Sequence, residues 1–193
     1  MNRKLIEMSR TKELAIIALL STVSLILRLT VEIPFPLATY LKLEIWEIPA
    51  YVALIAYGPR LGIGTALIVF LSVQAFVTGL PLGPFYNLIA VISTMGGILF
   101  GANIANKLGV NITDSRSFGA SLVFGTLSRT IIMTLVNFIV LPQPFPIGYE
   151  IPVEALPPIL GYTALFNIIV ATYSIIIAKI ITERILPIIK TAK

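Results

Sequence analysis

Amide and hydroxyl side chains recur within the apolar stretches of this 193-residue sequence, where a polar group needs a hydrogen-bonding partner. They occur at Asn87, in a run of Thr130, Thr134 and Asn137, and in a second stripe of Thr163, Asn167, Ala171 and Ser174. Steps of three and four residues place each run on one face of a helix. Two interpretations are open: these groups join helices, or they line a pocket and offer hydrogen bonds to a bound molecule.

The residue types that are missing narrow the chemistry. The sequence contains no His and no Cys, which removes the commonest acid–base group near neutral pH and the commonest metal ligands. None of the five long apolar stretches contains a pair of acidic residues. We therefore expect no catalytic residues, no metal site and no cofactor. A channel is also disfavoured, because no ring of charges or carbonyl filter motif is evident.

A mixed segment of prolines, aromatics and charges covers residues 32–47. It precedes an apolar stretch that is too short to cross a bilayer alone. Irregular backbone at membrane depth is tolerated only where protein covers it or where it lines a cavity. We expect this segment to form a lid over an outward-facing pocket. An ordinary interfacial loop with a belt of Trp and Tyr is the alternative.

Two arginines fall within apolar stretches. Arg28 lies near the outer end of the first stretch, and we expect it to reach the interface or to pair with Glu32, four residues later. Arg129 stands in the middle of its stretch, where a charge is costly and needs a reason. Because it lies on the inner side of Thr134 and Asn137, we expect it to lock helices together or to contact a partner subunit.

The composition identifies the medium around these residues. Hydrophobic residues make up 57% of the chain and charged residues 12%, and the mean hydropathy is +0.97. A soluble domain carries roughly a quarter charged residues, so we predict an all-α membrane protein with six transmembrane helices, the second one short. The expected spans are residues 14–31, 41–58, 61–80, 85–105, 118–141 and 156–181. We expect them to form a single membrane domain over residues 1–193.

The distribution of charge predicts the orientation. Most of the 14 basic residues lie in the two terminal segments and in the loop around residues 107–116, whereas the alternate loops carry the acidic residues Glu32, Glu44, Glu47, Glu150 and Glu154. This asymmetry places both termini in the cytoplasm and the protein in the plasma membrane. Because the basic residues flank the membrane spans and set the orientation, the net charge of +5 does not indicate a nucleic-acid partner. No phosphate-binding Gly-x-x-x-x-Gly-Lys-Ser/Thr motif occurs.

Several motifs together resemble one family, the substrate-binding S components of energy-coupling factor (ECF) vitamin transporters, and within it the riboflavin-specific type. The motifs are Leu41-Lys42-Leu43-Glu44-Ile45-Trp46-Glu47-Ile48-Pro49-Ala50, Gly58-Pro59-Arg60-Leu61-Gly62, Gly83-Pro84-Phe85-Tyr86-Asn87, the stretch from Gly125 to Asn137, and Phe166-Asn167. The resemblance covers residues 14–181. The riboflavin type usually has a Lys three residues after the last Asn, and this chain has Val170 there.

The resemblance implies a transport subunit without enzymatic activity. It would capture riboflavin or a related flavin at its outer end and work with a transmembrane coupling protein and two ATPase subunits. Another vitamin, such as pantothenate, a folate or a thiamine precursor, is the alternative within transport, and a structural membrane protein is the alternative outside it.

The expected substrate site combines aromatic walls for a flat ring with amides for its polar edge. Its predicted residues are Tyr40, Leu41, Lys42, Glu44, Trp46, Phe85, Asn87, Thr134, Asn137, Tyr162, Phe166 and Asn167, with Phe138 as a further wall. A docking face for the coupling protein is expected on the first helix, where Ala15, Ala18 and Thr22 are small enough to allow close helix approach.

Overall fold

The computed structural model describes residues 9–30, 33–75, 80–108 and 115–191. Within these residues the chain forms six α-helices, one 3-10 helix and a two-stranded hairpin. The elements are α1 (Arg10–Thr30), β1 (Ile33–Phe35), β2 (Ala38–Leu43), α2 (Ile48–Tyr57), α3 (Pro59–Ala75), α4 (Gly83–Lys107), α5 (Ser115–Val140), η1 (Val153–Ala155) and α6 (Leu156–Thr191).

Four of the helices are long and apolar enough to cross a membrane, namely α1, α4, α5 and α6. The other two are shorter: α2 has 10 residues and α3 has 17. At 1.5 Å per residue, α2 covers only about half of a hydrocarbon core of roughly 30 Å. The prediction of six helices with a short second one agrees with this structure.

The predicted start of the second helix, at residue 41, is wrong. Residues Ala38–Leu43 form β2, which pairs antiparallel with β1, and the helix begins only at Ile48. The chain here alternates Leu41, Lys42 and Leu43, a period of two that suits a strand. Pro49, which lacks an N–H group, sits in the first turn of α2, where no helical hydrogen bond is lost. The all-α expectation therefore omitted one small hairpin.

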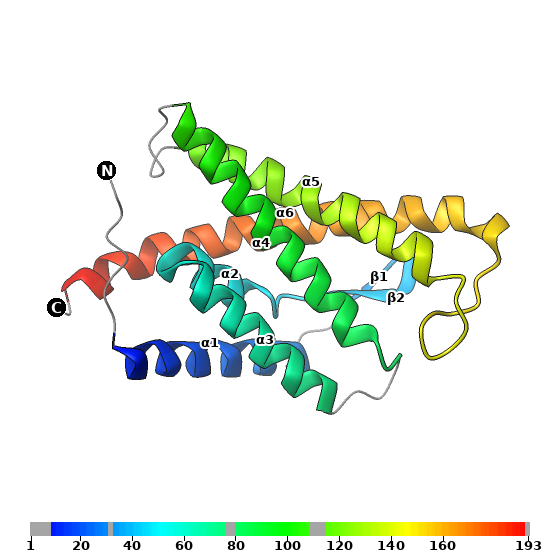
Figure 1. Cartoon of the computed structure of the whole chain (residues 1–193), viewed down its shortest axis with the longest axis horizontal. Coiled ribbons are helices and arrows are strands. Elements are labelled where there is room, and N and C mark those ends of the chain that lie inside the picture. Colours follow the sequence, from blue (N-terminus) through cyan, green and yellow to red (C-terminus); the bar gives the residue numbers. More distant parts are fainter. Residues whose placement is uncertain (1–8, 31–32, 76–79, 109–114, 192–193) are drawn as a thin grey trace.

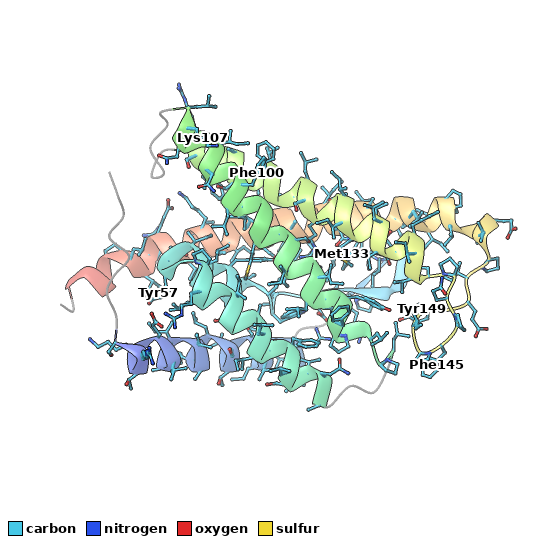
Figure 2. The ribbon with its side chains drawn as sticks, viewed as in Figure 1. Tyr57, Phe100, Lys107, Met133, Phe145 and Tyr149 are labelled. Atoms are coloured by element: carbon cyan, nitrogen blue, oxygen red, sulfur yellow. The ribbon has the colours of Figure 1, made fainter. Side chains whose placement is uncertain are left out.

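The hairpin marks one end of the bundle, which we call the hairpin end (Figure 1). The start of α6 and the loop that joins it to α5 lie at this end, whereas the start of α1 and the last turns of α6 lie at the opposite end (Figure 1). Figure 2 shows Phe145 and Tyr149 on the loop at the hairpin end and Tyr57 and Lys107 at the other. The side chains of Phe145 and Tyr149 are both more than half exposed.

Helix α2 lies at the centre of the core. Eight of its ten residues are aliphatic or small and the other two are Tyr, and all except Ile55 and Tyr57 are buried. A helix that is hydrophobic on every side is buried on every side, and α2 packs against α1, α3 and α6. Gly58 ends it with a φ of 104°, a conformation that favours glycine, and Pro59 begins α3.

Close backbone contact joins α4 to α5. Gly97 and Gly101 lie one turn apart on α4, and a Cβ at Gly97 would stand 2.3 Å from the carbonyl oxygen of Phe124. A Cβ at Gly101 would stand 2.4 Å from the carbonyl oxygen of Ala120. Glycine at both positions therefore lets the two backbones approach, as small residues do between membrane helices.

We predict that Gly97→Ala lowers the free energy of unfolding by about 1–3 kcal/mol, because the backbone of α5 would have to move. Thermal unfolding of the purified protein in detergent measures the effect. Gly96→Ala is the matched control, since a Cβ there meets nothing within 4 Å, and it should be neutral or slightly stabilising. Equal melting temperatures for the two variants would contradict the close contact.

Candidate functional site

A buried ion pair joins α5 to the start of α2. Arg129 Nη1 donates to both carboxylate oxygens of Glu47, at 2.8 and 2.7 Å, and more weakly to the hydroxyl oxygen of Tyr51 at 3.4 Å. Its Nε donates to Asn167 Oδ1 on α6 at 2.9 Å. Arg129 is 5% exposed and Glu47 2%. The interpretation of Arg129 as a residue that locks helices together agrees with this geometry.

The ion pair explains how two charges exist in an apolar bundle. Each charge removed from water loses several kcal/mol of hydration, which only close opposite charge and further hydrogen bonds can offset. Glu47 is the residue before α2, and its backbone carbonyl also accepts from Ala50 and Tyr51 at 3.1 and 3.3 Å. The carboxylate is therefore held by a rigid helix start, in the position where Arg129 can reach it.

A second ion pair lies three residues earlier. Arg28 Nη1 donates to Glu44 Oε2 at 2.9 Å, and the same oxygen accepts the indole N–H of Trp46. The guanidinium carbon of Arg28 lies 5.2 Å from the centre of the Trp46 ring, within the range of a cation–π interaction. The predicted partner Glu32 lies outside the described residues, and the partner observed is Glu44.

Residues 44–47 are thus fixed to three helices. Glu44 binds Arg28 of α1, Glu47 binds Arg129 of α5, and the hydroxyl of Tyr173 on α6 donates to the backbone oxygen of Glu44 at 2.6 Å. This short non-helical segment connects the hairpin to α2. The hairpin can therefore shift relative to α2 only through a change in the backbone before Glu44.

The hairpin packs on α6 through an apolar cluster. The rings of Phe35 and Phe166 meet edge to face with centroids 5.5 Å apart, and Val170 is buried beside them. Leu41, Leu43 and Tyr173 complete the cluster. The hairpin therefore covers the face of α6 that carries Phe166, next to the buried amide of Asn167.

The structure brings part of the predicted substrate site together. Leu41 and Phe166 lie in the cluster between the hairpin and α6, and Asn167 binds Arg129. The side chains of Glu44 and Trp46 contact Arg28 instead. The second predicted stripe, Thr163, Asn167, Ala171 and Ser174, is buried along its whole length. On α5, Asn137 is half-buried and donates to the Met133 carbonyl oxygen at 2.6 Å.

A pocket beside Trp46 holds another predicted residue. Asn87 of α4 lines it together with Arg28, Trp46, Phe70 and Leu88. The pocket lies between α1, α3 and α4, and it shares no residue with the cluster on α6. Trp46 and Asn87 are thus grouped with Arg28, whereas Asn167 is grouped with Arg129.

The remaining predicted residues are exposed or half-buried, except that the Tyr40 side chain lies outside the described part of the chain. Phe85, Phe138 and Tyr162 are 45%, 54% and 41% exposed, and Lys42 is exposed as well. Thr134 is half-buried on α5. The structure thus separates a buried polar group around Asn167 from aromatic residues on the outer surface of the bundle.

Sequence reasoning missed Glu47, Tyr51 and Tyr173 as site residues. One signal pointed to Glu47: an arginine inside a span requires a counter-ion, and Glu47 directly precedes the apolar helix. Nothing in the one-dimensional pattern indicated which helix would face Arg129, because the two residues are 82 positions apart.

Comparison with known proteins places this fold in a class of membrane transport subunits. The chain belongs to the family of substrate-specific components of ECF transporters, whose family model matches residues 12–186. It is therefore a component of a transporter and not an enzyme.

The chain is similar to riboflavin transporter FmnP of Bacillus subtilis (strain 168), with 31% identity over 136 residues, 68% of this chain and 67% of the relative. It is also similar to riboflavin transporter RibU of Staphylococcus aureus (strain TCH60), with 31% identity over 140 residues, 72% of this chain and 70% of the relative.

The fold matches a solved structure described as the S component of a bacterial ECF transporter. The TM-score is 0.76 at 26% sequence identity, and the match covers 94% of this chain and 99% of the other. The family resemblance and the helical membrane fold predicted from the sequence are thereby confirmed.

We predict that Arg129→Met destabilises the protein by about 3–5 kcal/mol, because it leaves the Glu47 carboxylate buried without its partner. The double variant Arg129→Met with Glu47→Leu should recover most of this loss, since it removes both charges together. Thermal unfolding in detergent compares the two. A double variant as unstable as the single one would show that the ion pair does not balance the buried charges.

Proposed function

We propose that this chain captures riboflavin or a closely related flavin for an ECF-type importer driven by ATP. The observation that carries the proposal is the likeness to two riboflavin transporters over about 70% of the chain, together with a fold shared with an S component over 94% of it. The proposed site lies at the hairpin end, between residues 41–47, α5 and α6.

The residues at this end suit a flavin. The isoalloxazine ring is flat and largely apolar, with one edge of carbonyl and imide groups, and it requires apolar walls and a few hydrogen-bonding groups. Phe166 offers aromatic surface on α6, and the adjacent Asn167 offers an amide next to the Arg129 ion pair. Trp46 offers a second aromatic surface, beside Arg28 and Asn87. Asn137 and Thr134 add polar groups on α5.

The position of Arg129 bears on the missing lysine. The riboflavin type usually carries a basic residue three positions after the Asn, whereas Val170 here is buried against the hairpin. A basic group nevertheless stands beside Asn167, because Arg129 reaches it from α5. This supports a site whose polar part keeps a guanidinium beside the Asn, supplied by a different helix and paired with Glu47.

The same proposal gives the chain an orientation and partners. The hairpin would face the outside, and both termini would lie in the cytoplasm, where a transmembrane coupling protein and two ATPase subunits would drive transport. Ala15, Ala18 and Thr22 are all exposed on α1. The Thr22 hydroxyl donates to the Ala18 carbonyl oxygen at 2.9 Å, so this face presents small side chains with satisfied polar groups.

We predict that the purified protein in detergent binds riboflavin and quenches its fluorescence in a saturable way. Trp46 is the sole tryptophan and borders the proposed site, so its own emission should fall along the same titration curve. Pantothenate, a folate and thiamine are the control ligands. Saturable binding of one of these with no response to riboflavin would contradict the proposed substrate.

We predict that Ala18→Trp abolishes vitamin uptake by the complex with its coupling protein and ATPases while riboflavin binding in detergent is unchanged. A bulky side chain would keep the partner helix from approaching. Val123→Trp is the control, since Val123 is exposed on α5 away from this face. Equal uptake by both variants, or concentrative uptake by this chain alone in liposomes, would contradict the proposed assembly.

A further inference from the structure

The amide of Asn167 can adopt only one orientation in this fold. A guanidinium carries only hydrogen-bond donors, so the atom that faces Arg129 Nε at 2.9 Å must be the amide oxygen. The other amide atom lies 2.8 Å from the carbonyl oxygen of Thr163, which only accepts, so it must be the nitrogen. Both neighbours thus select the same orientation independently.

Arg129 is itself held in place. Its Nη1 is bound by both oxygens of Glu47, which is fixed at the start of α2. All three residues are at least 95% buried, so water does not replace a lost bond. Turning the amide by 180° would set donor against donor at Arg129 and acceptor against acceptor at Thr163. Two lost hydrogen bonds disfavour that state by at least roughly a hundredfold.

One N–H group of Asn167 remains. The amide nitrogen carries two, and one is used on Thr163. Among the described residues, no hydrogen bond occupies the second. The oxygen already accepts from Arg129, so the group of Asn167 that still lacks any partner among the described residues is a donor.

We propose that Arg129 is a positioning residue: it turns the Asn167 amide so that an N–H group faces the substrate, and it thereby selects substrates with a hydrogen-bond acceptor at that point. The inference rests on the proposed function, because it takes Asn167 as part of the capture site. For a flavin, the acceptor is one of the two carbonyl oxygens at the edge of its ring.

The test compares riboflavin with 2-thioriboflavin and 4-thioriboflavin, in which sulfur, a weaker acceptor, replaces one carbonyl oxygen. The wild type should bind at least one thio analogue about tenfold more weakly than riboflavin. In the double variant Arg129→Met with Glu47→Leu, where Thr163 alone still selects the orientation of the amide, that ratio should fall clearly below its wild-type value. A purely structural role would weaken all three ligands alike and leave the ratio unchanged.

Two further variants sharpen the comparison. The double variant Arg28→Met with Glu44→Leu removes the other ion pair, which does not contact Asn167, so affinities should fall together at a constant ratio. Asn167→Asp keeps an acceptor for Arg129 and loses the N–H group, so it should lower riboflavin affinity by at least about tenfold. A ratio that is constant in every variant, or an Asn167→Asp variant that binds like the wild type, would overturn the proposal.

A measurement without ligand separates this proposal from the proposed function. With asparagine labelled by nitrogen-15, the Asn167 side-chain amide should exchange its protons slowly in the wild type and at least about tenfold faster in the Arg129→Met, Glu47→Leu variant. Equal exchange would refute the positioning role even if riboflavin binds. Slow exchange in a protein that fails to bind riboflavin would instead refute the substrate and leave the orientation of the amide established.

Discussion

The arrangement of this bundle depends on the need to neutralise Arg129 where water is absent. An unpaired guanidinium is costly among apolar helices, and the chain solves this with a carboxylate at the start of α2. Because α2 has only 10 residues, its first residues do not reach the edge of an apolar layer roughly 30 Å thick. The short helix therefore places Glu47 inside the bundle, where Arg129 needs it.

This solution determines the connection to the hairpin. The chain that enters α2 must pass through the bundle as non-helical backbone, which is tolerated where protein covers it. Glu44, Trp46 and the Tyr173 hydroxyl satisfy that segment through contacts with α1 and α6. The hairpin itself touches α6 mainly through the Phe35 cluster. Residues 44–47 are thus held by ion pairs and hydrogen bonds, whereas the hairpin before them is held largely by apolar contacts. This arrangement suits a capture site.

The packing of the long helices supplies the frame around this polar centre. Gly97 and Gly101 bring α4 and α5 into backbone contact, and the rings of Phe100 and Phe124 meet edge to face at 5.1 Å beside them. This contact fixes α5, and with it the position of Arg129, relative to the rest of the bundle. The glycines and the ion pair therefore contribute to one result: a guanidinium held still enough to orient a neighbouring amide.

The sequence by itself determined the medium, the helices and the candidate polar residues. Composition and the length of apolar stretches predicted six membrane helices because hydrophobic burial and helix rise are local properties. The spacing of Thr163, Asn167 and Ser174 likewise predicted one buried stripe. Tertiary structure alone decided which groups meet. Glu47 and Arg129 are 82 residues apart, and Arg28 binds Glu44 where local spacing favoured Glu32. Pairing between distant charges depends on how helices pack, and one-dimensional periodicity does not contain that information.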